Sequence, residues 1–307
     1  MSTVLVTGAS GYVGSAIVPR LKASGHTVRA FARTPAKVTA PVDQVVAGDA
    51  VTGQGLDRAM DGVDVAYFLI HSMEGAAGGG FDSAEASSAE NFAAAAQKAG
   101  VRRVVYLGGL VPTDHAPSRH LGSRLAVERT LLASAPEAVA FRASIVIGAG
   151  SRSFRFLVRL VERTPILPLP SWQRYRTQPI DERDVLALLH AAGTREDVTG
   201  AHTYDIGGPD VVTYGELITR IRDSMMVSRP TLALPLSVTP IAAKVAAAIA
   251  GEDVGLIEPL MESLASDLLV NPAHDAPRRF GVRMHSFDAS VERALRDWER
   301  TEELAAR

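Results

Sequence analysis

The chain has 307 residues, of which 47% are hydrophobic and 21% charged, and its formal net charge is −2. These values are typical of a soluble globular protein, and without a basic excess neither a nucleic acid nor a membrane is expected as a partner. The chain lacks cysteine, which excludes disulfides, thiolate catalysis and cysteine-ligated metals, and its eight histidines lack the spacing of a zinc site. We therefore expect no metal centre.

The N-terminus runs directly into an apolar segment, without the basic start and cleavage site of a signal peptide, which predicts a cytoplasmic protein. Residues 232–250 are nearly all apolar and about long enough to span a bilayer. Pro235, Pro240 and Lys244 interrupt this segment, so we expect a buried or pocket-lining helix with an irregular start rather than a transmembrane helix.

The first 150 residues alternate short β-branched segments with helical ones. Strands are expected at 4–6, 27–32, 44–47, 65–70, 104–107 and within 139–147, and helices at 13–23, 83–99 and 121–134. This alternation predicts an α/β protein of the Rossmann type, a doubly wound parallel sheet with helices on both faces.

The pattern changes after residue 150. Helices are expected at 152–163, 184–192, 214–226, 261–269 and from 289 onward, with a strand at 202–205. Thr213 stands where it would cap the helix that follows it. We interpret residues 1–150 as a dinucleotide-binding domain and residues 151–307 as a smaller substrate-binding part that interleaves with the sheet, with an approximate boundary between them.

Three glycines, Gly8, Gly11 and Gly14, connect the first predicted strand to the first predicted helix. Glycine is needed where the backbone turns tightly and where phosphate oxygens approach the main chain. The helix N-terminus adds free N–H groups and the positive end of a dipole. A dinucleotide pyrophosphate is therefore expected here. Its expected contacts are Gly8, Ser10, Gly11, Tyr12, Val13 and Gly14.

Arg33 follows the second predicted strand, 19 positions after Gly14, and no acidic residue lies between Gly8 and Pro41. An acidic residue at this place would bind the ribose 2′-hydroxyl of NAD, whereas an arginine accommodates the 2′-phosphate of NADP. The sequence thus favours NADP(H) over NAD(H), with Lys37 as a second cation. A solvated surface arginine is the alternative for Arg33.

Asp49 and Ala50 follow the third predicted strand and are expected beside the adenine. Two roles remain open for Asp49, because its carboxylate could accept a hydrogen bond from the adenine amino group or cap the helix that follows.

The fourth predicted strand is followed by a histidine and a serine. Ligands of such sheets bind outside the carboxyl ends of the strands, so Leu69, Ile70 and His71 are expected beside the cofactor and Ser72 beside the substrate. A loop histidine without a ligand is the alternative for His71.

Several segments carry a family resemblance. They are TGASGYVG, the GD after the third strand, AGVRRVVYLGGL, YFLIHSM, HLGSR, FRASIVIGAGS, RTQPIDERDVL and LIEPLMESL. Together they resemble an atypical short-chain dehydrogenase/reductase of the NAD(P)H-binding, nucleoside-diphosphate-sugar-epimerase-like group, related to NmrA-like proteins and to complex I accessory subunits. The resemblance covers nearly the whole chain, and it implies a Rossmann fold with a C-terminal substrate-binding part.

The chain departs from this family at the catalytic pair. Family enzymes use Tyr-x-x-x-Lys, but none of the six tyrosines here has a lysine four residues later, and Gly108-Gly109 replaces the expected serine. His120 and Arg124 stand at the place of the pair and share one helix face. We expect Gly108 and Arg124 to contact the cofactor, and His120, or else His71, to donate a proton. Alternatively, His120 only forms a hydrogen bond near the helix start.

Four further residues are candidates for substrate binding: Arg152, Trp172, Tyr175 and Arg176. The two arginines would meet an anionic or carbonyl oxygen of the substrate, or else are solvated or ion-paired. The two aromatic residues would line an apolar pocket.

Three functions follow from these expectations. The first is an NADPH-dependent reductase of a small, fairly apolar carbonyl or enone compound, acting as a monomer or homodimer. The second is a non-catalytic NADP(H)-binding redox sensor of the NmrA-like kind, which the missing tyrosine-lysine pair favours. The third is a sugar-nucleotide epimerase, which would normally need that tyrosine.

Overall fold

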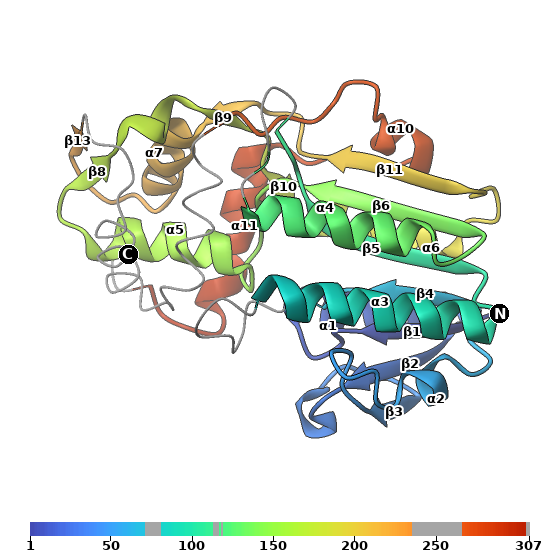
Figure 1. Ribbon diagram of the computed structural model, residues 1–307. Coiled ribbons are helices and arrows are strands. Elements are labelled where there is room, and N and C mark those ends of the chain that lie inside the picture. The colour runs from blue at the N-terminus through green and yellow to red at the C-terminus, as the bar shows by residue number, and fades with distance from the viewer. Residues whose placement is uncertain (71–80, 113–116, 118, 235–265, 305–307) are drawn as a thin grey trace.

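A parallel sheet forms the centre of the computed structural model, which describes residues 1–70, 81–112, 117, 119–234 and 266–304 (Figure 1). The sheet has seven strands in the order β11-β6-β5-β4-β1-β2-β3, and all its neighbours pair in parallel. The strands are β1 (Thr3–Thr7), β2 (Thr27–Ala32), β3 (Gln44–Ala47), β4 (Val65–Phe68), β5 (Arg103–Gly109), β6 (Glu137–Ala143) and β11 (Ala201–Ile206). This order confirms the predicted Rossmann fold.

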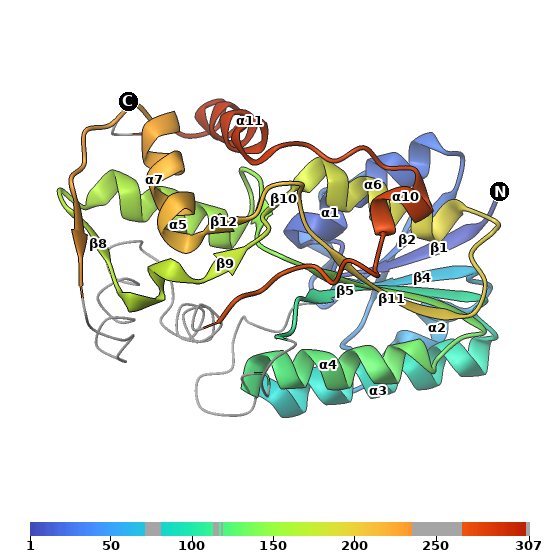
Figure 2. The same cartoon turned by 90° about the horizontal axis from the view of Figure 1, so that it is seen from above.

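Helices cover both faces of the sheet (Figure 2). One face carries α1 (Tyr12–Ala23) and α6 (Glu182–Thr194), and the other carries α2 (Leu56–Met60), α3 (Phe81–Ala99) and α4 (Arg119–Leu132). Alternate residues of a strand point to opposite faces, so Val4 and Val6 pack in the core beneath α1 and α6, while Leu5 packs beneath α2 and α3. Because both faces are covered, β4 is buried at every position.

The C-terminal part lies beyond the carboxyl ends of the sheet strands (Figure 1). Its elements are β7 (Val146–Ile147), α5 (Arg152–Arg163), β8 (Leu167–Leu169), β9 (Arg176–Thr177), β10 (Ile180–Asp181), β12 (Val212–Thr213), α7 (Tyr214–Ser224), β13 (Thr231–Ala233) and α11 (Phe287–Glu299), with a 3-10 turn at Ser171–Arg174. Its core contains Phe154, Leu217 and Trp298 from α5, α7 and α11. Helix α11 belongs to this core and also contacts β7 and β10.

Two further short elements accompany the sheet. A 3-10 turn follows β2 at Pro35–Lys37, and α10 (Ala276–Phe280) packs beside β11 and α6. The chain thus leaves the sheet after β6 and returns to it with α6 and β11.

Many expected elements are confirmed. The expected ranges 27–32, 44–47 and 152–163 coincide with β2, β3 and α5. Thr213 caps α7, because its hydroxyl accepts a hydrogen bond from the Glu216 N–H at 3.1 Å and the Glu216 carboxylate accepts one from the Thr213 N–H at 2.7 Å.

Two expectations are wrong where the structure describes them. Residues 266–269, the end of the helix expected at 261–269, are not helical, because Leu268 bridges to Thr177 and Asp267 pairs with Arg176. The start of the segment 232–250 belongs to β13 rather than to a helix, and Leu232 is 52% exposed, while Ala233 and Leu234 line a pocket as expected. The rest of both segments lies outside the described residues. Within the described ranges, no helix has the length and apolar composition needed to cross a membrane.

Candidate functional site

The site lies where the chain order of the sheet reverses, between β1 and β4. Ligands of doubly wound sheets bind at this point, at the carboxyl ends of the strands. The loop from Gly8 to Gly11 follows β1 and leads into α1, and Leu69 follows β4 beside it.

Two of the loop glycines are required by close backbone contacts. Gly8 has a φ of +74°, and a Cβ atom there would lie 2.4 Å from the Leu69 carbonyl oxygen. A Cβ atom on Gly14 would lie 2.1 Å from the Gly8 carbonyl oxygen. A side chain at either position would therefore push β1, β4 and α1 apart.

The first turn of α1 presents free donors. Gly11 is the N-cap, and its own N–H donates to the Gly8 carbonyl at 2.8 Å. The first intrahelical donor is the Ser15 N–H, which bonds to the Gly11 carbonyl at 2.9 Å, so the N–H groups of Tyr12, Val13 and Gly14 before it have no backbone partner among the described residues. The first turn holds no acidic residue, and Ser10 is exposed beside it. This geometry fits a bound pyrophosphate.

Two cations lie at the carboxyl end of β2. The side chains of Arg33 and Lys37 are exposed, and neither forms a hydrogen bond or ion pair with any residue that the structure describes. Both are therefore available to a ligand phosphate, and their contact with a 2′-phosphate remains a prediction.

The turn after β3 corrects one role of Asp49. Helix α2 begins only at Leu56, with Gly55 as its N-cap, so Asp49 does not cap it. The Asp49 N–H instead pairs with the Gln54 carbonyl at 2.9 Å, and its carboxylate accepts a hydrogen bond from the Val51 N–H at 2.8 Å. This loop delays the start of the helix. The predicted contact of Asp49 with the adenine is untested.

Asn91 of α3 was not singled out from the sequence. Its side-chain amide donates to the carbonyls of Ala50, at 3.0 Å, and Val51, at 2.9 Å. It thereby holds the turn that was predicted to meet the adenine. Only the tertiary contact between α3 and this turn, 41 residues apart, identifies it.

The end of β4 is described only in part. Leu69 is buried and Ile70 half-buried, and both lie next to the glycine loop. His71 and Ser72 lie outside the described residues.

Arg124 is buried between α3 and α4. Its guanidinium pairs with the Glu85 carboxylate at 3.0 Å, and the Ser123 hydroxyl donates to the same carboxylate at 3.1 Å. Arg124 thus has a structural partner, and its contact with the nicotinamide ribose remains a prediction. His120 lies in the first turn of α4, but its side chain is outside what the structure describes.

Tyr106 of β5 is a second residue that sequence reasoning missed. A Cβ atom on Gly108 would lie 2.9 Å from the Tyr106 ring and 3.1 Å from its hydroxyl, so the phenol occupies the space of a side chain at position 108. Burial raises the pKa of Tyr106 to about 12, against the opposing charge of Arg124. The phenol therefore stays protonated at neutral pH.

The four substrate candidates have different surroundings. Arg176 pairs with Asp267 at 2.6 Å, whereas Arg152 is exposed in the first turn of α5. Trp172 is buried against Tyr214, with ring centroids 6.1 Å apart. Tyr175 is half-buried beneath the Arg174 guanidinium.

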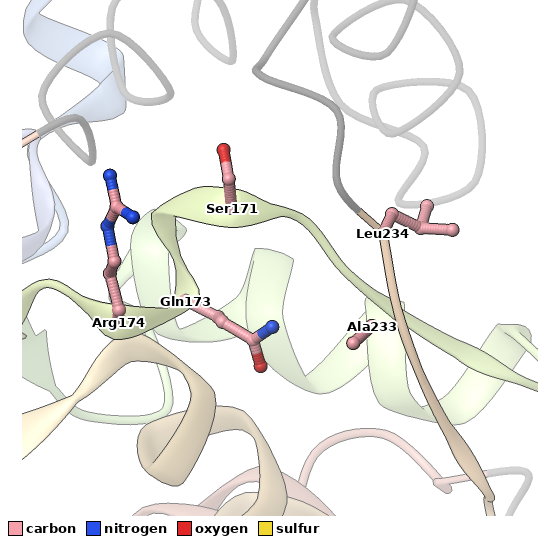
Figure 3. Close-up of a pocket in the computed structure, with 5 residues that line it drawn as sticks. All are labelled: Ser171, Gln173, Arg174, Ala233 and Leu234. Atoms are coloured by element: carbon pink, nitrogen blue, oxygen red, sulfur yellow. The ribbon is translucent and has the colours of Figure 1, made fainter.

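A pocket of about 580 Å³ is lined in part by Ser171 and Gln173, the two sequence neighbours of Trp172 (Figure 3). Its lining combines polar and apolar side chains from the turn before β9 and from the end of β13. The lining residues are Ser171, Gln173, Arg174, Ala233 and Leu234. Such a mixed lining suits a small ligand with an apolar body and a polar group.

Comparison with known proteins places the chain in a family. The NAD(P)H-binding family matches residues 8–144. A (4-alkanoyl-5-oxo-2,5-dihydrofuran-3-yl)methyl phosphate reductase of Streptomyces griseus is 31% identical over 74% of this chain and 74% of its own length. The chain belongs to an atypical short-chain dehydrogenase/reductase family of NAD(P)H-binding oxidoreductases.

Two other relatives match over less of their length. Subunit 9 of the NADH dehydrogenase 1 alpha subcomplex of Arabidopsis thaliana is 29% identical over 69% of this chain, and a ceramide reductase of Caulobacter vibrioides is 29% identical over 61%. The matched regions span only 55% and 60% of those two proteins.

Solved structures share the fold. MoeE5 in complex with UDP-glucose and NAD superposes with a TM-score of 0.69 at 20% identity, over 97% of this chain and 98% of its own. A UDP-glucose 4-epimerase of Thermus thermophilus in complex with NAD gives a TM-score of 0.69 at 16% identity, over 97% and 99%.

Proposed function

We propose that this protein is an NADPH-dependent reductase of a small, fairly apolar carbonyl or enone compound, acting in the cytoplasm. The observation that carries the proposal is the open first turn of α1 together with Arg33 at the end of β2, whose side chain has no partner in the part of the chain that the structure describes. A pyrophosphate at the first and a 2′-phosphate at the second would bind one NADPH molecule.

The chemistry is divided between cofactor and chain. When bound, the reduced nicotinamide supplies a hydride. Arg124 would hold the nicotinamide ribose, and His120 or His71 would donate a proton to the substrate oxygen. The two relatives named as reductases support this reaction class. The pocket lined by Ser171, Gln173, Arg174, Ala233 and Leu234 supports a substrate with an apolar body and a polar group.

The second candidate function is a non-catalytic NADP(H)-binding sensor of the NmrA-like kind. The ion pair of Arg124 with Glu85 favours it, because this pair gives Arg124 a structural role that requires no part in catalysis. An epimerase ranks third, because it would normally need the tyrosine of the missing Tyr-x-x-x-Lys pair.

A measurement of substrate turnover distinguishes the reductase from the non-catalytic sensor. With NADPH and a panel of ketones, quinones and enones, we expect oxidation of NADPH at 340 nm with at least one compound, and about a 100-fold or greater loss of this rate in His120→Ala. His202→Ala is the matched control. His202 is an exposed histidine near the N-terminal end of β11, away from the carboxyl ends of the strands where the cofactor is expected. Tight NADPH binding without turnover of any compound would overturn the reductase and favour the sensor. Unchanged kinetics of His120→Ala would remove that histidine from the reaction.

Cofactor preference is tested at Arg33. In Arg33→Ala we expect the Kd for NADPH to rise about 10- to 100-fold, because a charged phosphate contact is lost, while the Kd for NADH stays within about twofold. Titration of protein fluorescence gives both constants. Arg300→Ala, which removes an exposed arginine at the end of α11, should change neither. Equal weakening of both cofactors would contradict the 2′-phosphate assignment.

A further inference from the structure

Tyr12 connects the first turn of α1 to the start of α6 and to the loop before α5. Its hydroxyl donates a hydrogen bond to the carboxylate of Glu182, the first residue of α6. Burial and the neighbouring Glu182 carboxylate raise the pKa of Tyr12 well above its ordinary value. The phenol is therefore a permanent donor across the physiological pH range.

The ring of Tyr12 packs onto two glycines of the loop before α5. A Cβ atom on Gly148 would lie 1.9 Å from the Tyr12 hydroxyl, and one on Gly150 would lie 2.5 Å from its ring. Neither glycine has a positive φ, so both are required for space rather than for backbone conformation. The loop leads to Ser151, the N-cap of α5.

Arg293 of α11 is a second partner of the Glu182 carboxylate, in addition to Tyr12. One of its terminal nitrogens lies 3.3 Å from the Glu182 carboxylate and 3.4 Å from that of Asp181, and the other lies 2.8 Å from Asp297. The Glu182 carboxylate is therefore held between a phenol and a guanidinium, with its side chain only 19% exposed. Charge-assisted hydrogen bonds of this kind fix geometry more firmly than neutral ones.

We propose that Tyr12, Glu182 and Arg293 form a latch that positions the first turn of α1, so that its free N–H groups meet the dinucleotide pyrophosphate. Tyr12 supplies both parts of the connection, because its N–H belongs to the anion-binding turn and its phenol to the latch. Glu182 and Arg293 are positioning residues. They lie outside the matched NAD(P)H-binding region, residues 8–144, and nonetheless set cofactor affinity.

The latch rests on the proposed binding of NADPH, and its test uses Tyr12→Phe and Glu182→Ala in the full-length protein. Tyr12→Phe keeps the ring over Gly148 and Gly150 and leaves Glu182 paired with Arg293, so the fold is retained. We expect each variant to raise the Kd for NADPH about tenfold, as the loss of one hydrogen bond to a charged group predicts. The double variant should bind NADPH no more weakly than Glu182→Ala alone, because without the Glu182 carboxylate the Tyr12 hydroxyl no longer contributes to the latch.

Two controls separate positioning from general destabilisation. Tyr67→Phe removes another buried tyrosine hydroxyl, which donates to the Leu189 carbonyl at 3.0 Å, and should leave the Kd for NADPH unchanged. Adenosine 2′-phosphate lacks the pyrophosphate, so its affinity should be the same in wild type, Tyr12→Phe and Glu182→Ala.

The possible results are distinct. Wild-type affinity for NADPH in Tyr12→Phe, additive losses in the double variant, or equal weakening of adenosine 2′-phosphate would each overturn the latch while leaving the proposed function intact. A wild-type protein that binds no NADPH would overturn the proposed function and the latch with it.

Discussion

Replacement of Gly14 by alanine is expected to raise the Kd for NADPH by about 100-fold or more and to lower the free energy of unfolding by about 1–3 kcal/mol. The added Cβ atom would lie 2.1 Å from the Gly8 carbonyl oxygen and 3.1 Å from the Ala9 Cα. Both contacts are with backbone, so the start of α1 must move away from β1. That movement displaces the N–H groups that would bind the pyrophosphate.

Gly25→Ala is the matched control for this prediction. Gly25 lies just after α1, has a φ of +80°, and has open space around its Cβ position. Alanine there should lower the free energy of unfolding by about 1 kcal/mol through backbone strain alone and leave the Kd for NADPH unchanged. Fluorescence titration and urea unfolding followed by circular dichroism measure the two quantities. If Gly14→Ala bound NADPH as the wild type does, the anion site would not lie at this turn.

Replacement of Arg103 by methionine is expected to lower the free energy of unfolding by about 3–5 kcal/mol. Arg103 of β5 is fully buried, and its guanidinium donates to three carbonyl groups at the end of α6 and beyond it. These belong to Ala192 at 3.0 Å, Arg195 at 2.8 Å and Val198 at 3.1 Å. Methionine has a similar length but no donor, so all three carbonyls would lose a partner inside the protein.

Arg102 provides the control, because it is adjacent in sequence and pairs with the same carboxylate. Arg102 lies 2.6 Å from Glu137 and Arg103 lies 2.8 Å from it, but the Arg102 side chain is 46% exposed. Arg102→Met should therefore lower the free energy of unfolding by less than about 1 kcal/mol. Equal losses in the two variants, measured by urea unfolding, would show that burial does not decide the contribution of these arginines.

Local patterns in the sequence were sufficient for the fold. The fully buried strand β4 corresponds to a continuous apolar segment, glycine marked the turn into α1, and β2 and β3 were predicted with their observed bounds. The helix expected at 261–269 is wrong at its described end because Arg176 and Thr177 of β9 bind that segment in an extended conformation. Pairing of this kind depends on residues about 90 positions away, which a local pattern does not contain.

Some residues of the candidate site could likewise be predicted from the sequence, and others could not. The donors of α1 and the cation at Arg33 follow from a spacing of a few residues, and both could be predicted. The partners of Arg124 and Tyr12 could not, because Glu85 and Glu182 reach them only through helix packing. Asn91 was not predicted for the same reason, because its contact with the turn after β3 depends on the packing of α3.

The sequence by itself determined the Rossmann sheet and the glycine turn, since strand periodicity and backbone sterics act within a few residues of one another, and it predicts an NAD(P)H pyrophosphate at that turn. The tertiary structure alone decided that Asp49 closes a turn rather than capping a helix, that Arg124 pairs with Glu85, and that the Tyr12 hydroxyl bonds to Glu182 of α6. Those contacts depend on how the elements pack, because a charged or hydroxyl group inside a protein binds whichever partner the packing brings within reach.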